Sequence, residues 1–171
     1  KIRFTTSVVK LPIRNPVLVA KQVTSINAIT NNRFAFGIGL SPWIEDFEIC
    51  GERWDGRGPR MDEMIEIIRG LHTGDFYGFK GKYYDIPEIK LCPVPSQQTP
   101  IFIGGHAELA LKRAAKVGDG WVHAGGTIET LKPLLKNITI KAFMGTWCGD
   151  SQQQTPVFYK ILDTADFNYK N

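Results

Sequence analysis

The sequence predicts an α/β fold built on a parallel sheet. Apolar strand-like runs alternate with helical stretches, glycine clusters follow successive strands, and 43% of the 171 residues are apolar, enough to bury a core. Strands that alternate with helices pair in parallel through right-handed crossovers. A closed barrel and an open sheet both satisfy this pattern.

The amino-terminal part predicts a strand and then a long helix. Ile2–Val9 is an extended apolar run, and Asn15 and Pro16 suit the N-cap and first position of a helix over 16–30. The asparagine pair at 31–32 ends that helix.

The middle of the chain predicts one buried strand and two helices. Arg33–Gly39 reads as the strand, and Ser41-Pro42 leads into a short helix that ends near Gly51. A second helix, closed by Gly74, follows from apolar residues at helical spacing: Met61, Met64, Ile65, Ile68 and Leu71.

The next stretch predicts a hairpin and two further strands. Phe76–Ile86 suggests a surface hairpin around Gly81, and the proline-rich link Leu91–Pro100 leads to a buried strand, Ile101–Ile103. A helix with Leu109, Ala110, Ala114 and Val117 then precedes the strand Trp121–His123. Beyond it we expect a helix over 128–135, a strand over 139–144 and a helix over 151–162.

Composition narrows the class of protein. A formal charge of +4 with scattered Lys and Arg argues against a nucleic-acid partner, and no apolar run approaches bilayer-spanning length. Three widely spaced cysteines fit neither a disulfide scaffold nor a metal site. We therefore expect a soluble cytoplasmic protein; because the chain begins at Lys1, its native start is expected to be missing.

Glycine-rich strand ends predict an anion site. In parallel α/β proteins the reactive groups lie at the carboxyl ends of strands. Here those positions are Gly37 and Gly39, then 104–106, then 123–126. Backbone without side chains lets a phosphate approach amide groups at helix starts, although tight turns alone also explain single glycines.

Seven segments, in order, resemble the luciferase-like monooxygenase family, whose members are TIM barrels that use FMN or the deazaflavin F420. They include T-T-S-V-V-K-L-P-I-R-N-P, R-F-A-F-G-I-G-L-S-P-W and I-F-I-G-G-H-A, and span 5–16, 33–43, 46–51, 57–71, 81–86, 101–107 and 113–121. The resemblance covers residues 1–126 and implies a partial (β/α) barrel.

The resemblance also implies a cofactor site, with F420 favoured and FMN as the alternative. Ser7-Val8 matches a bulged pair that carries a non-prolyl cis peptide bond behind the deazaflavin ring. The loop that wraps the cofactor phosphate matches Gly104, Gly105, His106 and Ala107, and neighbouring strand ends match Gly39, Ala124 and Gly125.

Family chemistry would be hydride transfer between the cofactor ring and a small-molecule substrate. His106 and His123 could donate protons or hydrogen bonds, or could be ordinary rim histidines. Trp43 and Trp121 could stack on a flat ring or belong to the core. Arg57 and Arg60 could bind a phosphate or an acidic cofactor tail, or could be solvated at a helix start.

The family pattern is incomplete in this chain. A TIM barrel takes about 250 residues and eight strands, whereas this part supplies what resemble strands three to six. Unpaired strand edges expose backbone groups, which predicts self-association of the chain through those edges.

The last segment resembles a different family. The strand I-T-I-K-A-F-M and the motif G-T-W-C-G-D-S, with Cys148 at a helix start, are similar to a thioredoxin-like protein over residues 130–171. Ser151 stands where a second cysteine would resolve a disulfide, so an inert thiol is the alternative. We expect 127–137 to be a seam helix and 138–171 the first β-α unit of that fold.

Three functional hypotheses follow. The first is an F420- or FMN-dependent oxidoreductase present as a barrel fragment, and the second is a thiol-redox protein that acts through Cys148. The third is a chimeric fragment without independent activity.

Overall fold

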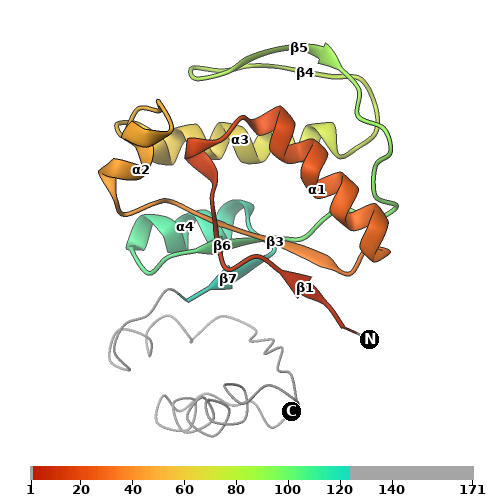
Figure 1. The fold of residues 1–171 in the computed structure, drawn as a ribbon, viewed down its shortest axis with the longest axis horizontal. Coiled ribbons are helices and arrows are strands. Elements are labelled where there is room, and N and C mark those ends of the chain that lie inside the picture. Colours follow the sequence, from red (N-terminus) through yellow and green to blue (C-terminus); the bar gives the residue numbers. More distant parts are fainter. Residues whose placement is uncertain (1, 124–171) are drawn as a thin grey trace, which may run out of the picture. The chain divides into compact units, whose positions relative to one another are not determined.

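The computed structural model describes residues 2–123, which form a parallel β/α unit (Figure 1). Its strands are β1 (Phe4–Thr5), β2 (Val9–Lys10), β3 (Phe34–Gly39), β6 (Ile101–Gly104) and β7 (Gly120–Val122). β1 and β2 both pair with β3, and β6 and β7 follow in chain order, all in parallel. Four strand positions in sequential order make half of an eight-stranded barrel.

The helices cover one face of this sheet. They are α1 (Pro16–Thr30), α2 (Ile44–Ile49), α3 (Arg57–Leu71) and α4 (Glu108–Val117), with a short 3-10 helix at Leu11–Ile13. One face of the sheet packs on α1 and α3 through alternate buried residues: Phe34, Phe36, Ile38, Ile101 and Ile103. This one-sided arrangement favours a partial barrel over an open doubly wound sheet.

The predicted caps of α1 are confirmed. The Asn15 side chain accepts hydrogen bonds from the backbone N–H groups of Val17 and Leu18, at 2.9 and 3.1 Å. Asn31 adopts the left-handed conformation with φ 52° and closes the helix. Both ends of α1 are therefore fixed by residues beside it in the chain.

The predicted hairpin is also confirmed and runs further than expected. β4 (Tyr77–Lys80) pairs antiparallel with β5 (Asp85–Ile89). The Glu63 carboxylate on α3 accepts backbone N–H bonds from residues 82, 83 and 84, at 2.8, 2.9 and 3.1 Å. This carboxylate ties the hairpin tip to α3.

Two segments differ from the sequence prediction. The run Ile2–Val9 is not one strand, because residues 6–8 leave the ladder and separate β1 from β2. α3 begins at Arg57, which agrees with the helix start predicted at Arg57 and Arg60, but the surroundings of Arg60 differ from the prediction. Arg60 is buried, at 5% exposure, and one of its Nη groups donates to the carbonyls of Pro12 and Arg53. The solvated role predicted for Arg60 is therefore wrong, and its phosphate role stays a prediction.

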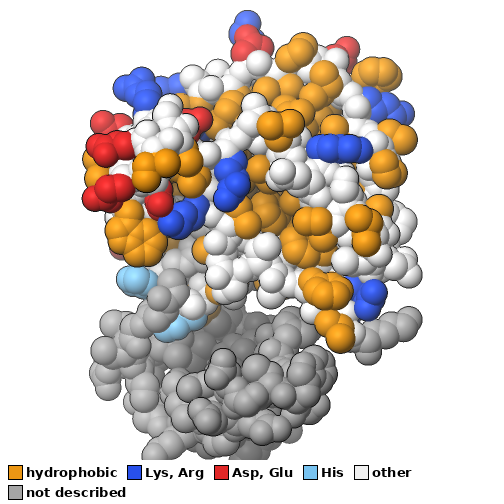
Figure 2. Space-filling view, viewed as in Figure 1, with side chains coloured by type: hydrophobic (Ala, Val, Ile, Leu, Met, Phe, Trp, Pro, Cys, Tyr) orange, Lys and Arg blue, Asp and Glu red, His pale blue; other side chains and the backbone are white. Residues whose placement is uncertain are grey.

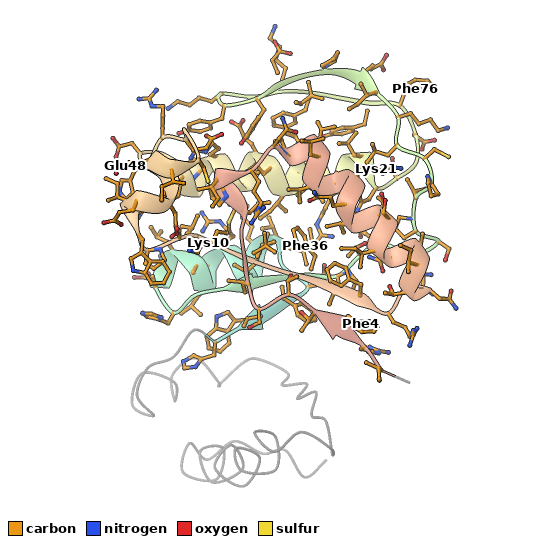
Figure 3. The ribbon with its side chains drawn as sticks, in the orientation of Figure 1. Phe4, Lys10, Lys21, Phe36, Glu48 and Phe76 are labelled. Carbon is orange, nitrogen blue, oxygen red and sulfur yellow. The ribbon has the colours of Figure 1, made fainter. Side chains whose placement is uncertain are left out.

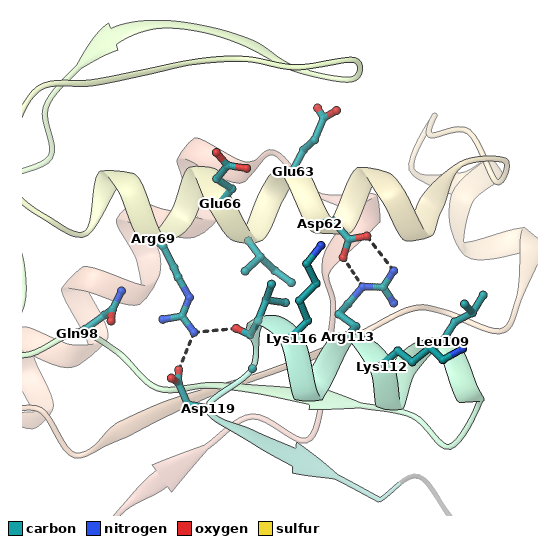
Figure 4. A pocket seen from close by; sticks show the side chains of 13 residues that line it. Asp62, Glu63, Glu66, Arg69, Gln98, Leu109, Lys112, Arg113, Lys116 and Asp119 are labelled. Atoms are coloured by element: carbon teal, nitrogen blue, oxygen red, sulfur yellow. Dashed lines mark hydrogen bonds and ion pairs between the residues drawn. The ribbon is translucent and has the colours of Figure 1, made fainter.

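A hollow between α3 and α4 lies outside the sheet (Figure 4). Arg113 pairs with Asp62, and Arg69 donates to Asp119 and to the Val117 carbonyl. These interactions of Arg113 and Arg69 attach α4 and the start of β7 to α3. No residue predicted as a site residue lines this hollow.

Among residues 2–123, no helix is long and apolar enough to cross a bilayer.

The backbone of the 6–8 segment lies against Gly37. A Cβ on Gly37 would lie 1.8 Å from the Thr6 carbonyl oxygen, and Thr6 Oγ1 donates to the Gly37 carbonyl at 2.8 Å. We therefore expect Gly37→Ala to lower the free energy of unfolding by about 3 kcal/mol, measured by urea denaturation. Gly58→Ala, in the first turn of α3, is the control and should stay within about 1 kcal/mol of wild type. Equal effects of the two substitutions would contradict this packing.

His72, at the end of α3, makes stability depend on pH. The ring is buried with Nε2 3.2 Å from the Ala20 carbonyl, and burial lowers its pKa below the ordinary 6.5, with the charge of Arg69 adding to the effect. The unfolded chain then binds more protons than the folded chain between the folded pKa and 6.5, so stability is full above that window and falls as pH drops through it.

The comparison of His72→Gln with wild type isolates this effect. Urea denaturation at pH 7.5 and 5.5 should show a smaller acid loss in the variant, since the amide keeps a donor for Ala20 but does not titrate. An equal loss in both proteins would exclude His72 as the source.

Candidate functional site

The carboxyl ends of the strands bring most of the predicted site residues together. Ser7 and Val8 are joined by a cis peptide bond, as the family resemblance implies. Val8 lies between two strand ends: a Cβ on Gly39 would be 3.0 Å from Val8 Cγ2, and one on Gly104 would be 2.8 Å from Val8 Cγ1. The missing side chains at 39 and 104 thus make room for Val8.

This packing changes the interpretation of two glycines. The family resemblance implies that Gly104 belongs to the loop around the cofactor phosphate and that Gly39 is a neighbouring strand end facing the cofactor. In the structure both give space to Val8, so their direct contact with a cofactor stays a prediction. The apolar Val8 side chain is what these strand ends present.

Gly105 begins the loop that leads into α4. Its φ of 125° is a conformation that L residues rarely adopt, and a Cβ there would meet the Ala110 Cβ at 3.0 Å. Its carbonyl accepts Trp121 Nε1–H at 2.6 Å, and its N–H donates to the Val122 carbonyl at 3.2 Å. The loop is therefore fastened to β7 on both sides of Gly105.

The start of α4 has no side-chain cap. Ala107 occupies the N-cap position, and the N–H groups of Ala110 and Leu111 both bond back to its carbonyl. The amides of Glu108 and Leu109 precede the first helical bonds and point out of the helix end. The Glu108 carboxylate pairs with Lys112 Nζ one turn further on, at 2.6 Å. This helix end is suited to an anion.

Both predicted histidines lie at this edge and are exposed (Figure 2). His123 follows β7 rather than belonging to it, and its ring meets the edge of Trp121 at a centroid distance of 5.1 Å. Partial desolvation lowers the pKa of His123, and the charge of His106 lowers it further. His123 is consequently neutral near pH 7, which is the form that accepts a proton.

Sequence reasoning missed a polar cluster on the same edge. Lys10, whose place is labelled in Figure 3, extends from β2 to α2, where Nζ lies 2.6 Å from Asp46 Oδ2. The buried Ser41 hydroxyl donates to the same carboxylate oxygen. The hydrogen bonds of Lys10 and Ser41 lower the pKa of Asp46, so it is ionised near neutral pH. Lys10, the one charge in the run S-V-V-K-L-P-I, was the available signal.

Three predicted site residues, Ala124, Gly125 and Cys148, lie outside the described residues, as do the predicted seam helix and thioredoxin-like unit. Within the described part, Cys50 and Cys92 are free and exposed. Arg57 stacks on Trp54, with its guanidinium carbon 3.5 Å from the ring centroid.

Comparisons with known proteins bear on this edge. The model of the family described as luciferase-like monooxygenase matches residues 1–141. The match runs through the predicted seam, 127–137, into the segment that resembles a thioredoxin, and no finding supports that second resemblance. The domain boundaries stay a prediction.

Relatives share the same region. An uncharacterized protein of Mycobacterium tuberculosis H37Rv is 51% identical over 138 residues, which cover 81% of this chain and 48% of that protein. An FMNH2-dependent dimethylsulfone monooxygenase of Pseudomonas fluorescens is 35% identical and an F420-dependent glucose-6-phosphate dehydrogenase of Amycolatopsis mediterranei 29%. Each aligns with 74% of this chain, and the chain spans 36% and 39% of those proteins. The chain therefore spans about half the length of its relatives or less.

Solved structures support the fold. A monooxygenase of Streptomyces bottropensis superposes with a TM-score of 0.72 at 16% identity, over 96% of this chain and 57% of that one. A coenzyme F420-dependent tetrahydromethanopterin reductase of Methanopyrus kandleri gives 0.69 at 18% identity, over 79% and 43%.

The contact of Val8 with Gly104 can be tested by a double-mutant cycle. Gly104→Ala should lower the free energy of unfolding by about 2 kcal/mol, because its methyl group meets Val8 Cγ1. In a Val8→Ala background that loss should shrink by about 1 kcal/mol, as measured by urea denaturation. Additive losses would show that the two side chains do not compete for one space.

Proposed function

Because the chain belongs to the luciferase-like monooxygenase family, we propose that its strand ends bind the redox cofactor of an F420- or FMN-dependent oxidoreductase. Relatives in the family are named for both cofactors. We favour F420 because Ser7-Val8 matches the bulged pair that the family resemblance places behind a deazaflavin ring. FMN is the alternative.

One observation carries this proposal: the apolar Val8 side chain packs at the strand end that leads into a helix start without a side-chain cap. Val8 rests against Gly104, and the next residue, Gly105, opens the loop to the uncapped start of α4. A cofactor with a flat ring and a phosphate needs this combination, the ring on Val8 and the phosphate on the amides of residues 106–109. The residues present therefore fit the group.

The bound cofactor would supply hydride chemistry. The chain's own groups would orient the cofactor and would accept or relay a proton. The Val8 side chain would set the depth of the ring, and the Gly105 loop would fix the tail. His123, neutral near pH 7, would accept or relay a proton at an imidazole nitrogen, with His106 beside it. The substrate is a small molecule whose identity we leave open.

The alternatives from the sequence receive no further support. Cys148 lies outside the described residues, and the two relatives with a stated activity are named for FMNH2 and for F420. An inactive chimeric fragment, and self-association through the exposed strand edges, stay predictions. A cooperative thermal melt of the 171-residue chain would argue against the chimeric fragment.

The phosphate site can be separated from the ring site with two ligands. FMN carries a phosphate that riboflavin lacks, so wild type should bind FMN more tightly in a fluorescence titration. Gly105→Ala should weaken FMN about tenfold and change riboflavin little, because a side chain at φ 125° distorts the loop.

Gly51→Ala is the matched control: Gly51 also has a positive φ, 68°, but no atom lies within 4 Å of its Cβ position. It should leave both affinities unchanged. A parallel titration with F420 decides between the cofactors. Absence of binding of both FMN and F420 at high micromolar concentration would reject the proposed function for this chain.

A further inference from the structure

The two tryptophans at the carboxyl edge have different surroundings. Trp121 is half-buried, its Nε1–H is used by the Gly105 carbonyl, and its ring meets His123. Trp43 has 57% of its surface exposed. By contrast Phe47, in the helix α2 that follows Trp43, is fully buried. A large exposed aromatic side chain needs a reason, and for Trp43 core packing does not supply one.

Trp43 is nevertheless held in place. Lys10 Nζ lies 4.6 Å from its ring centroid, and the same ammonium group pairs with Asp46 at 2.6 Å. The Trp43 backbone N–H donates to Ser41 Oγ at 3.1 Å, and Ser41 has only 1% of its surface exposed. A cation thus lies over the indole ring, and a buried hydroxyl fixes its backbone.

This indole belongs to the same edge as the Val8 surface. Lys10 pairs in register with Gly39, and a Cβ on Gly39 would lie 3.0 Å from Val8 Cγ2, so Lys10 and Val8 adjoin the same residue at the end of β3. Lys10 therefore connects the Val8 surface to Trp43.

We propose that Trp43 is a stacking subsite for the flat conjugated ring of the cofactor, and that Lys10 is the positioning residue that holds the indole there. This inference rests on the proposed function, since it names a further contact of the same ligand. The exposed indole surface offers the polarisable area that a tricyclic ring requires, and Asp46 leaves the cluster without a surplus positive charge.

Time-resolved fluorescence of bound FMN tests the proposal. An indole in contact with an excited flavin quenches it by transferring an electron that then returns, so wild type should show a strongly shortened lifetime. Trp43→Phe should lengthen that lifetime, and Trp43→Ala should weaken FMN binding by about two- to tenfold.

Trp54→Phe is the matched control. Trp54 is held against Phe47 at 5.1 Å between ring centroids and under the Arg57 guanidinium, so its removal should leave the flavin lifetime unchanged. An unchanged lifetime in Trp43→Phe with FMN still bound would overturn the inference and leave the proposed function intact. If wild type bound neither FMN nor F420, the proposed function itself would be rejected.

The role of Lys10 has its own signature. Lys10→Met removes the cation over the indole and the partner of Asp46, so the bound-flavin lifetime should become heterogeneous as Trp43 samples several rotamers. Lys10→Arg keeps both interactions and should restore the single short lifetime. A lifetime in Lys10→Met equal to that of wild type would overturn the positioning role.

Discussion

The close approach of residues 6–8 to the end of β3 is the constraint on which the rest of this unit depends. The Thr6 carbonyl occupies the space where Gly37 would carry a Cβ, and Val8 fills the space beside Gly39 and Gly104. Three positions without side chains therefore let one irregular segment rest on two strands. Any larger residue at Gly37 would push the segment, and Val8 with it, away from the sheet.

The same constraint arranges the candidate site. Val8 packs against Gly104, and the residues that follow Gly104 lead into the uncapped start of α4. Two residues after Val8, Lys10 contacts Asp46 and Trp43. Apolar surface, free amides and a fixed indole thus share one edge of a half-barrel. The hollow between α3 and α4 combines apolar residues such as Ile65 and Val117 with charged ones, of which Arg69 pairs with Asp119 and Arg113 with Asp62, and none of the predicted site residues lines it.

The sequence predicted those parts of the fold that neighbouring residues determine. Asn15 and Asn31 cap α1 through contacts within a few residues, so a local pattern was sufficient. The interruption of Ile2–Val9 was not predicted from periodicity, because a bulge keeps the same apolar composition as a strand; only the family resemblance indicated it.

The candidate site, too, was predicted only where neighbouring residues determine it. The Gly105 loop was predicted because glycines recur at successive strand ends and because I-F-I-G-G-H-A resembles the family's phosphate loop. The cluster of Lys10, Ser41 and Asp46 was missed because it joins residues up to 36 positions apart and left only one unexplained charge in the sequence. The glycines at 39 and 104 were recognised and assigned to a ligand, but their packing against Val8 was not predicted. A missing side chain does not reveal which neighbour takes the space.

The most direct test of this account is an NMR titration of the 171-residue chain, labelled at amides and at valine methyl groups, with FMN and then with riboflavin. The account predicts that FMN shifts the Val8 methyl signals together with the amide signals of residues 105–109, and that riboflavin shifts Val8 alone. Shifts confined to the α3–α4 hollow, or amide shifts at 105–109 without any change at Val8, would contradict it.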